Sequence, residues 1–275
     1  MLAAALLSTI PPPPFQNLQL GPLTLHGYGL VMGIAIILAI NVWDRGLRLQ
    51  HVDTARLTTL AVLSVIGGFI GARLYHVASE PIRYAHHPGQ IIEIWNGGLG
   101  IYGAVLGGGL VALGLAPRFG IPRRACADAA APALLLAQAI GRIGNYLNQE
   151  LFGKPFTGWW ALRVDERFRP AEFASRTTFH PTFLYEALAC FALFLVFAWL
   201  LRSWARRPTG ILLPLYVAAY SVARILVEPL RIDHANHWLG VRQNVWVAGS
   251  LIVASLITAW FMAHRQRRAT GSPLT

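Results

Sequence analysis

Long apolar runs constrain the fold of this chain more than any other feature of its sequence. A helix that crosses a bilayer needs about 20 consecutive, mostly apolar residues. Seven stretches qualify: Pro22–Trp43, Leu57–Ala78, Trp95–Ala116, Cys126–Leu147, Pro181–Leu201, Gly210–Leu230 and Asn244–Ala263. Only 13% of the residues are charged, whereas soluble domains average about 25%. We therefore predict an all-α, polytopic membrane protein with seven transmembrane helices.

The distribution of cations predicts how these helices are oriented. The net charge is +11 at pH 7, but the arginines form short clusters between apolar runs, and the chain has no nucleic-acid-binding motif. Three arginines lie in each of the segments 44–56, 117–125 and 202–209 and in the tail 264–275, all on one predicted side. The short loops opposite carry only Arg83, Arg231 and Arg242. Because short cytoplasmic loops are enriched in Lys and Arg, we expect a periplasmic N-terminus and a cytoplasmic C-terminus.

The predicted spans also divide the chain into regions. Residues 1–21 form a periplasmic tail at the membrane surface, without the basic start of a signal peptide, residues 22–263 the membrane domain, and residues 264–275 a cytoplasmic tail. The long connection 148–180 is rich in polar residues, and we expect a periplasmic arm or cap. Cys126 and Cys190 lie inside predicted spans, which favours small buried side chains over a disulfide or a metal site.

Glycines recur in the second and third predicted helices. They include Gly67, Gly68 and Gly71 in one helix and Gly103 and Gly107–Gly109 in the other. Small residues four positions apart let helix backbones approach closely in lipid, so we predict a packing role for most of them. The chain shows no convincing internal repeat, which weakens the case for a transporter built from inverted halves.

Three arginines lie inside predicted helices: Arg73, Arg142 and Arg224. An arginine at the bilayer centre costs at least about 2.5–3.5 kcal/mol, so each of them requires a partner or a wet cavity. On the predicted orientation, all three lie in the outer part of their helices. Asn145 follows Arg142 by three positions and Glu228 follows Arg224 by four, so each pair shares one helix face.

The residues alone leave two interpretations of these groups open. Arg224 and Glu228 suit either a buried ion pair that joins helices or part of a functional site. Arg142 has no carboxylate at helical spacing, and an under-neutralised guanidinium beside an amide favours an anionic ligand such as phosphate. Arg73 suits a ligand contact or a side chain that snorkels to the headgroups, and His180 suits a loop residue without a role. The other polar residues at this level are Tyr28, Tyr102, Tyr185, Glu186 and Tyr220.

The stretch Gly141–Gly153 reads GRIGNYLNQELFG. It closely resembles the signature of the prolipoprotein diacylglyceryl transferase family, GRxGNFxNxExxG, with Tyr146 in place of the usual Phe. Four further segments resemble family elements in the same order: HGYG at 26–29, WNGGLGIYGAVLGG at 95–108, HPTFLYEA at 180–187 and YSVARILVEPLR at 220–231. The chain departs from the family at Tyr102–Gly103, where some members have His-Gly, and its arm is shorter than in some members.

This resemblance implies an enzyme of the bacterial inner membrane. Such enzymes transfer the sn-1,2-diacylglyceryl group of phosphatidylglycerol to the thiol of a lipobox cysteine in prolipoproteins and release glycerol 1-phosphate, the first step of lipoprotein maturation. The implied partners are phosphatidylglycerol, lipobox-containing prolipoproteins and membrane lipids, but no nucleic acid, and no metal or organic cofactor is expected.

The resemblance and the residue types together predict the residues of the site. The predicted catalytic residues are Arg142, Arg224, Tyr102, Glu228 and Tyr28. The predicted phosphatidylglycerol-binding residues are Arg142, Asn145, Arg224, Glu150, Asn148, Gly153, His180 and Tyr220. In this hypothesis the two arginines bind phosphate, Glu228 orients Arg224, and Tyr102 assists proton transfer, although Tyr28, Glu150 and His180 are also candidates for the base.

A secondary transporter or channel for an anionic solute is the alternative function. It would also use intramembrane arginines, but near the midplane and with access from both sides, whereas the polar residues here concentrate toward one end of the helices. An intramembrane protease is disfavoured because the chain has neither H-E-x-x-H nor G-x-S-x-G, and no paired aspartates.

Overall fold

The computed structural model describes residues 9–21, 23–93, 97–233 and 236–270. Within them, seven helical segments are long and apolar enough to cross a membrane. They are α2 (Gly27–Leu49), α3 (Leu57–Ser79), α5 (Ile101–Leu115) with η3 (Ala116–Phe119), α6 (Arg123–Leu147), α7 (Thr182–Trp204), α8 (Leu212–Val227) with η6 (Glu228–Leu230), and α9 (Gln243–Thr270). The predicted all-α fold with seven transmembrane helices is confirmed.

Several helix boundaries differ from the predicted ones. The first helix begins at Gly27 because β1 (Asn17–Leu20) and β2 (Leu23–His26) form an antiparallel hairpin before it; Pro22 lies outside the described residues. It also continues past Trp43 to Leu49. There the ion pair between Asp44 and Arg48 (2.7 Å) spans one turn, and such pairs stabilise a solvated helix end.

The third span begins at Ile101 and not at Trp95, which lies with Asn96 outside the described residues. Gly97 and Gly98 have φ of 81° and 75°, and these left-handed values do not belong to a right-handed helix. At the other end of the chain, α9 continues beyond the predicted Ala263 to Thr270, since the loss of apolar character does not by itself end a helix.

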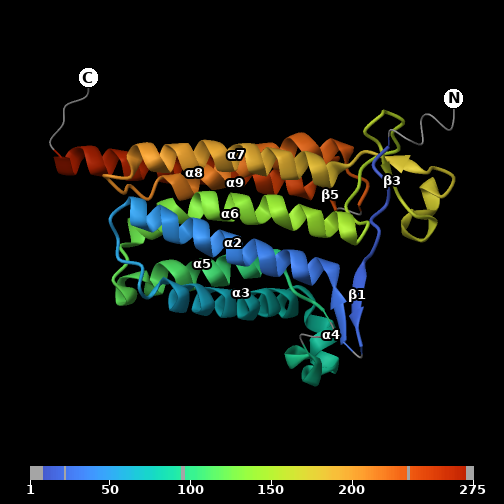
Figure 1. Cartoon of the computed structure of the whole chain (residues 1–275), viewed down its shortest axis with the longest axis horizontal. Coiled ribbons are helices and arrows are strands. Elements are labelled where there is room, and N and C mark those ends of the chain that lie inside the picture. Colours follow the sequence, from blue (N-terminus) through green and yellow to red (C-terminus); the bar gives the residue numbers. More distant parts are fainter. Residues whose placement is uncertain (1–8, 22, 94–96, 234–235, 271–275) are drawn as a thin grey trace.

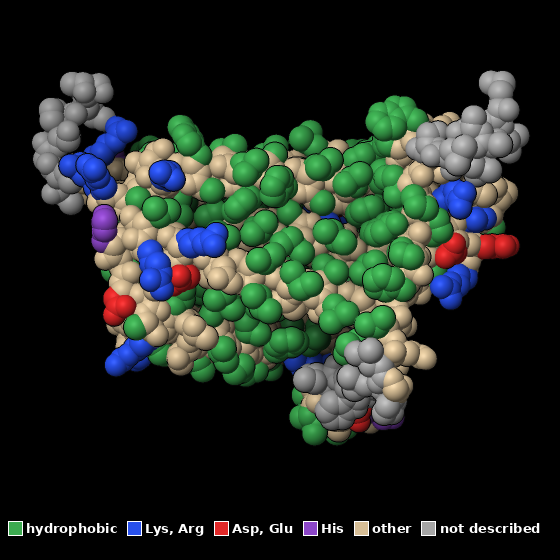
Figure 2. All heavy atoms as spheres, in the orientation of Figure 1, with side chains coloured by type: hydrophobic (Ala, Val, Ile, Leu, Met, Phe, Trp, Pro, Cys, Tyr) green, Lys and Arg blue, Asp and Glu red, His purple; other side chains and the backbone are tan. Residues whose placement is uncertain are grey.

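The helices form a layered bundle (Figure 1). α6 lies at its centre and packs against α2 and α7, α8 packs against α9, and α3 and α5 form a close pair on one side. Apolar side chains cover the middle of the face seen in Figure 2, whereas charged side chains gather toward the two ends. A belt of this kind is the surface that a lipid-embedded protein presents.

Glycines bring α3 and α5 together. A methyl group at Gly71 would collide with the carbonyl oxygen of Gly103, and one at Gly107 would collide with that of Gly67. The backbones therefore touch where no side chain intervenes, as small residues allow in membranes. The predicted packing role is confirmed for these four glycines.

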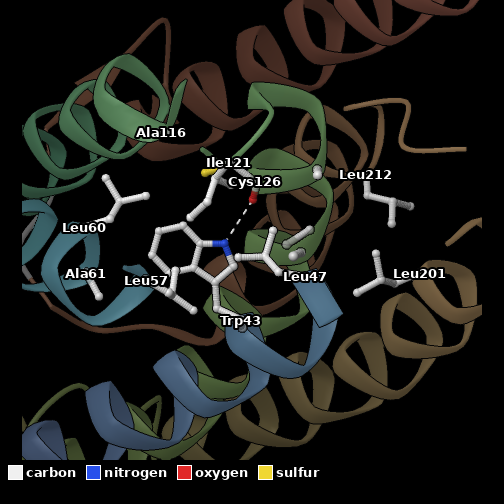
Figure 3. Close-up of a cluster of buried hydrophobic side chains, with 14 of the residues drawn as sticks. Trp43, Leu47, Leu57, Leu60, Ala61, Ala116, Ile121, Cys126, Leu201 and Leu212 are labelled. Atoms are coloured by element: carbon white, nitrogen blue, oxygen red, sulfur yellow. Dashed lines mark hydrogen bonds between the residues drawn. The ribbon is translucent and has the colours of Figure 1, made fainter. Parts of the chain in front are cut away.

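A buried apolar cluster stabilises the bundle at the end opposite the arm (Figure 3). The indole of Trp43 donates a hydrogen bond to the carbonyl of Cys126 (3.1 Å), and Leu47, Leu60 and Ile121 pack around it. Both cysteines are free and buried, as predicted. These contacts fix α2 against α6, and the two helices then run together toward the arm end.

The long connection 148–180 folds into short strands and 3-10 helices, here called the arm. It contains β3 (Leu162–Arg163), β4 (Thr178–Phe179), η4 (Glu166–Phe168) and η5 (Ala171–Phe173), with β3 antiparallel to β4. A satellite core stabilises it, formed by Phe152, Leu162, Val164, Phe179 and Phe183. Of the predicted N-terminal tail, residues 1–8 lie outside the described residues, and Ile10 bridges to Leu162 of the arm.

Four smaller elements complete the arm end of the bundle. α4 (Pro81–His86) and η1 (Pro88–Ile92) follow α3, and the hairpin of β5 (His237–Trp238) and β6 (Val241–Arg242) connects α8 to α9. All of them lie at the end of the bundle at which α6 passes into the arm (Figure 1).

Candidate functional site

Arg142 lies near the end of α6, where three groups surround its guanidinium. Nη1 donates to Oδ1 of Asn145 (3.3 Å), Nη2 donates to the hydroxyl of Tyr220 on α8 (3.2 Å), and Nη2 also forms an ion pair with Oε2 of Glu186 on α7. The interpretation of Arg142 as under-neutralised is therefore wrong. Helical spacing reveals partners on the same helix only, and Glu186 comes from a different one.

Arg224 on α8 shares that carboxylate. Its Nη1 lies 2.7 Å from Oε2 of Glu228 and 3.5 Å from Oε1 of Glu186. The Glu186 side chain is 3% exposed, whereas those of Arg142 and Arg224 are 16% and 17% exposed. The prediction that the two arginines occupy the same level of the bundle is confirmed by their common partner.

The network extends into the connection between α8 and α9. Arg231 contacts Oε1 of Glu186 (3.0 Å) and Oδ1 of Asp233 (2.6 Å), and Arg242 contacts Oε1 of Glu228 (2.8 Å). From the sequence, Arg231 and Arg242 were expected to be ordinary loop cations, and these contacts were not predicted. A signal existed for Arg231, which is the last residue of the family-like segment YSVARILVEPLR, but the position of Arg242 depends on the fold of the β5–β6 hairpin.

The amide of Asn244 and the carboxylate of Asp233 complete this part of the network. Nδ2 of Asn244, in the first turn of α9, donates to Oε1 of Glu228 (2.9 Å), so both oxygens of Glu228 are engaged. Burial alone would raise the pKa of Asp233, but the hydrogen bond from Arg231 and the charges of Arg231 and Arg242 hold that pKa below its usual value. Asp233 is therefore ionised at neutral pH.

The formal charges in this network do not cancel. Among the described residues that form it, four guanidinium groups (Arg142, Arg224, Arg231 and Arg242) face three carboxylates (Glu186, Glu228 and Asp233). The ion-paired groups alone therefore leave one positive charge in a largely buried setting, where electrostatic interactions are screened less than at a surface. The carboxylate of Glu150, which Asn145 links to Arg142 by hydrogen bonds, lies next to them.

A cavity of about 520 Å³ opens beside Arg231 and Arg242. Its lining comes from the arm and from the α8–α9 connection: Lys154, Pro155, Glu172, Phe173, Arg231, Ile232, Asp233, His237 and Arg242. The charged network thus has an opening at the arm end of the bundle.

Two asparagines, one in the last turn of α6 and one just after it, hold Glu150 beside this network. Nδ2 of Asn145 and Nδ2 of Asn148 both donate to Oε1 of Glu150, at 2.9 and 3.3 Å. Asn145 therefore uses its oxygen for Arg142 and its nitrogen for Glu150, which fixes the orientation of its amide. Gln149 and Leu151 adopt positive φ of 51° and 55°, so a tight turn presents Glu150 to the end of the helix.

The ring of Tyr28 packs against the same part of α6. A methyl group at Gly144 would lie 2.7 Å from Cδ2 of Tyr28, so the absence of a side chain at Gly144 makes room for the ring. The Tyr28 hydroxyl is within electrostatic range of Glu150 and Arg142. The structure thus brings together Tyr28, Arg142, Asn145, Asn148, Glu150, Tyr220, Arg224 and Glu228 of the predicted site residues.

Gly153 and His180 form the base of the arm. The Gly153 N–H donates to the carbonyl of His180 (2.8 Å), and a methyl group at Gly153 would lie 2.7 Å from the carbonyl oxygen of Leu230. His180 stacks on Phe156, with centroids 4.1 Å apart, and its Nδ1 lies 3.1 Å from the hydroxyl of Tyr185. Burial lowers the pKa of His180, which favours the neutral imidazole.

Comparison with known proteins agrees with this geometry. Residues 16–261 match the family model described as prolipoprotein diacylglyceryl transferase. The chain belongs to this family. It is 44% identical over 256 residues to the phosphatidylglycerol–prolipoprotein diacylglyceryl transferase of Frankia alni, an alignment that covers 91% of this chain and 66% of the relative.

Other members of the prolipoprotein diacylglyceryl transferase family give similar values. The enzyme of Frankia casuarinae is 42% identical, with 91% of this chain and 61% of the relative covered. That of Cutibacterium acnes is also 42% identical, with 83% of this chain and 78% of the relative covered. The chain thus spans slightly less than two thirds of the length of the two Frankia relatives.

Two residues singled out in the sequence of this family member lie on the α3–α5 pair. Arg73 is buried and donates to the carbonyls of Ile91 (2.8 Å), Gly97 (2.7 Å) and Gly98 (2.9 Å). It neither snorkels to the surface nor joins the network, because the loop carbonyls occupy its guanidinium. Tyr102 is half exposed, and its ring centroid lies 5.7 Å from that of Tyr75.

Proposed function

We propose that this chain transfers the sn-1,2-diacylglyceryl group of phosphatidylglycerol to the thiol of a lipobox cysteine in prolipoproteins. Its relatives are named phosphatidylglycerol–prolipoprotein diacylglyceryl transferases. The observation that carries the proposal is the pair of arginines on α6 and α8 that share Glu186 within a buried network of guanidinium groups and carboxylates. That arrangement suits an anionic lipid headgroup and an anionic leaving group.

The proposed reaction is a substitution at carbon. The cysteine sulfur forms a bond to the terminal glyceryl carbon of the lipid, and the bond between that carbon and its phosphate oxygen breaks. The bonding electrons leave with the oxygen, the products are a thioether and glycerol 1-phosphate, and the thiol proton passes to a base and then to water or the phosphate. Because the thiolate is the reactive form, the site must accept this proton.

Arg142 and Arg224 are the groups best suited to hold the phosphate. Negative charge grows on the leaving oxygens in the transition state, and cationic donors already in place there supply a large part of catalysis. A planar guanidinium matches two phosphate oxygens at once. Glu186 and Glu228 hold the two guanidiniums in position before the lipid arrives, so little reorganisation accompanies the reaction.

The polar groups around Arg142 complete the proposed headgroup site. Asn145 orients Arg142 and is itself held by Glu150, which Asn148 also contacts. The hydroxyl of Tyr220 accepts a hydrogen bond from Nη2 of the same guanidinium. In this proposal Tyr28 faces the glycerol hydroxyls, since a neutral phenol hydrogen-bonds them without adding charge.

Gly153 and His180 have a different part in the proposal. They hold the arm against the end of α8 through their backbone contacts, and the arm then bounds the headgroup site. In this proposal Tyr102, half exposed on α5, assists the transfer of the thiol proton. The partners of the reaction would be phosphatidylglycerol from the surrounding membrane lipids and an exported prolipoprotein, at the outer leaflet of the bacterial inner membrane.

A lipid-to-peptide transfer assay tests the proposal. The purified full chain, reconstituted in liposomes with labelled phosphatidylglycerol and a lipobox peptide, should form a labelled thioether peptide. Arg142→Ala should lower the rate about 100-fold or more, because it removes a preorganised cationic donor. Arg142→Lys, which keeps the charge but not the planar fork, should retain more activity than Arg142→Ala.

Arg202→Ala is the matched control, since Arg202 is an exposed arginine in the last turn of α7, at the other end of the bundle. It should leave the rate unchanged. Full activity of Arg142→Ala would remove Arg142 from the reaction, and no transfer by the unaltered chain would refute the proposed function. Protein-dependent flux of an anionic solute across sealed liposomes, without transfer, would favour a transporter instead.

A further inference from the structure

The turn between β5 and β6 contains an unexpected residue. Trp238 pairs with Val241, which leaves Leu239 and Gly240 as the two central turn residues, with φ of 52° and 77°. Two-residue hairpin turns with positive φ at both centres favour Asn, Asp or Gly at the first position. A leucine with positive φ is uncommon and unfavourable, so the turn geometry does not account for it.

The tip of this hairpin is also apolar and open. Leu239 is 91% exposed and Trp238 is 55% exposed. In water, a leucine and a tryptophan at the end of a two-stranded hairpin would gain nothing from their apolar surface. The tip therefore combines an unfavourable backbone conformation with an unfavourable solvent contact, and both need an explanation.

The position of the tip supplies one. The indole of Trp246, in the first turns of the membrane-spanning α9, donates to the carbonyl of Trp238 (3.1 Å), which ties the hairpin to the start of that helix. Figure 1 shows β5 beside the beginning of α9 at the arm end of the bundle. Trp246 is 44% exposed, and farther along α9 Val253 and Trp260 are 59% and 60% exposed. The tip continues the apolar surface that α9 presents to lipid.

We propose that the hairpin tip, Trp238–Leu239–Gly240, inserts into the lipid leaflet at the arm end of the bundle. Tryptophan is enriched where membrane proteins cross from lipid to water, and an apolar side chain beside it would lie among the acyl chains. The hairpin also connects the tip to the arginine network. Arg242 is its last residue, and Nε of Arg242 lies 2.8 Å from Oε1 of Glu228. The tip thus holds the α8–α9 connection at a set depth.

Depth-dependent quenching of a fluorescent probe tests this proposal. The full chain with Leu239→Cys, labelled with an NBD probe, is reconstituted in liposomes of phosphatidylglycerol and phosphatidylcholine. The two native cysteines are 0% and 1% exposed, and the unsubstituted chain measures any label that they take. We expect lipids with a nitroxide near the headgroup end of the acyl chain to quench the probe at least about twofold more than aqueous iodide does. Ala171→Cys, on the exposed face of η5, should show the opposite order.

A second substitution separates lipid contact from turn chemistry. Leu239→Asn supplies the residue that the turn prefers, and a probe at Val241→Cys reports the result. If the tip lies in lipid, Leu239→Asn should lower nitroxide quenching at position 241 and raise iodide quenching. Equal quenching with and without the substitution would overturn the proposal, as would iodide access at position 239 equal to that at position 171. Protection from both quenchers that depends on protein concentration would also overturn it, in favour of a second copy of the chain.

Discussion

Glu186 is the residue at which the helices of the site meet. Its Oε2 pairs with Arg142, and its Oε1 lies 3.0 Å from Arg231 and 3.5 Å from Arg224. These guanidiniums come from α6, α8 and the chain beyond η6, so one buried carboxylate compensates charges on three segments. Removal of one partner from a buried ion pair is more costly than the pair is stabilising, because the remaining charges stay in a poor solvent.

Glu186→Gln should therefore lower the free energy of unfolding by about 3–5 kcal/mol, the range found when a buried pair loses one member. The measurement is thermal or denaturant unfolding of the purified chain in detergent. Glu80→Gln is the control: the Glu80 side chain is 45% exposed and pairs with Arg83 at 3.4 Å, and exposed pairs contribute about 0–1 kcal/mol. Equal stability of the two variants would contradict the central position given to Glu186.

The same residues show how far sequence reasoning reaches into the site. Helical spacing predicted that Arg142 faces Asn145 and that Arg224 faces Glu228, and both contacts are present, at 3.3 and 2.7 Å. It could not reveal Glu186 as a common partner, because that contact joins three segments whose relative rotation is set by packing. The motifs identified most of the residues of the site, but only the folded structure shows which of their side chains form pairs.

At the scale of elements, the α3–α5 pair depends on backbone contact. The apolar runs predicted both helices, but not the start of α5. Gly97 and Gly98 lie within the apolar run, yet their φ values are left-handed, so α5 begins only at Ile101. Where the helices touch, a side chain on Gly107 would meet the carbonyl oxygen of Gly67. Backbone cannot swing aside as a flexible side chain does, so the helices would have to separate.

Gly107→Ala and Gly109→Ala provide a matched test on one helix. Gly107→Ala should destabilise the chain by about 1–3 kcal/mol, as overpacking does. Nothing lies within 4 Å of a methyl group at Gly109, so Gly109→Ala should be neutral or stabilising by up to about 1 kcal/mol, the helix propensity of Ala over Gly. Unfolding in the same detergent measures both. If Gly107→Ala were as stable as Gly109→Ala, close packing would not be what holds α3 to α5.

At the scale of the whole molecule, the spans found among the described residues are odd in number, so they place the two ends of the described chain at opposite ends of the bundle. β1 and the arm lie at one end of the bundle, and the last turns of α9 lie at the other (Figure 1). Which end faces the cytoplasm does not follow from the fold, because a bundle has the same internal contacts in either orientation. It follows from charge, since Arg and Lys near short loops are retained on the cytoplasmic side.

Three arginines lie in each of the four segments at the end away from the arm. We therefore predict that the arm faces the periplasm, where an exported cysteine and the outer leaflet are both within reach. When the chain is expressed in bacterial cells, a membrane-impermeant thiol reagent should label Ala171→Cys in the arm after the outer membrane is made permeable. It should label Arg206→Cys, an exposed position in the segment after α7, only after the inner membrane is also opened. The reverse pattern would put the arginine network on the cytoplasmic side, where no exported substrate could meet it, and the proposed reaction would fail with it.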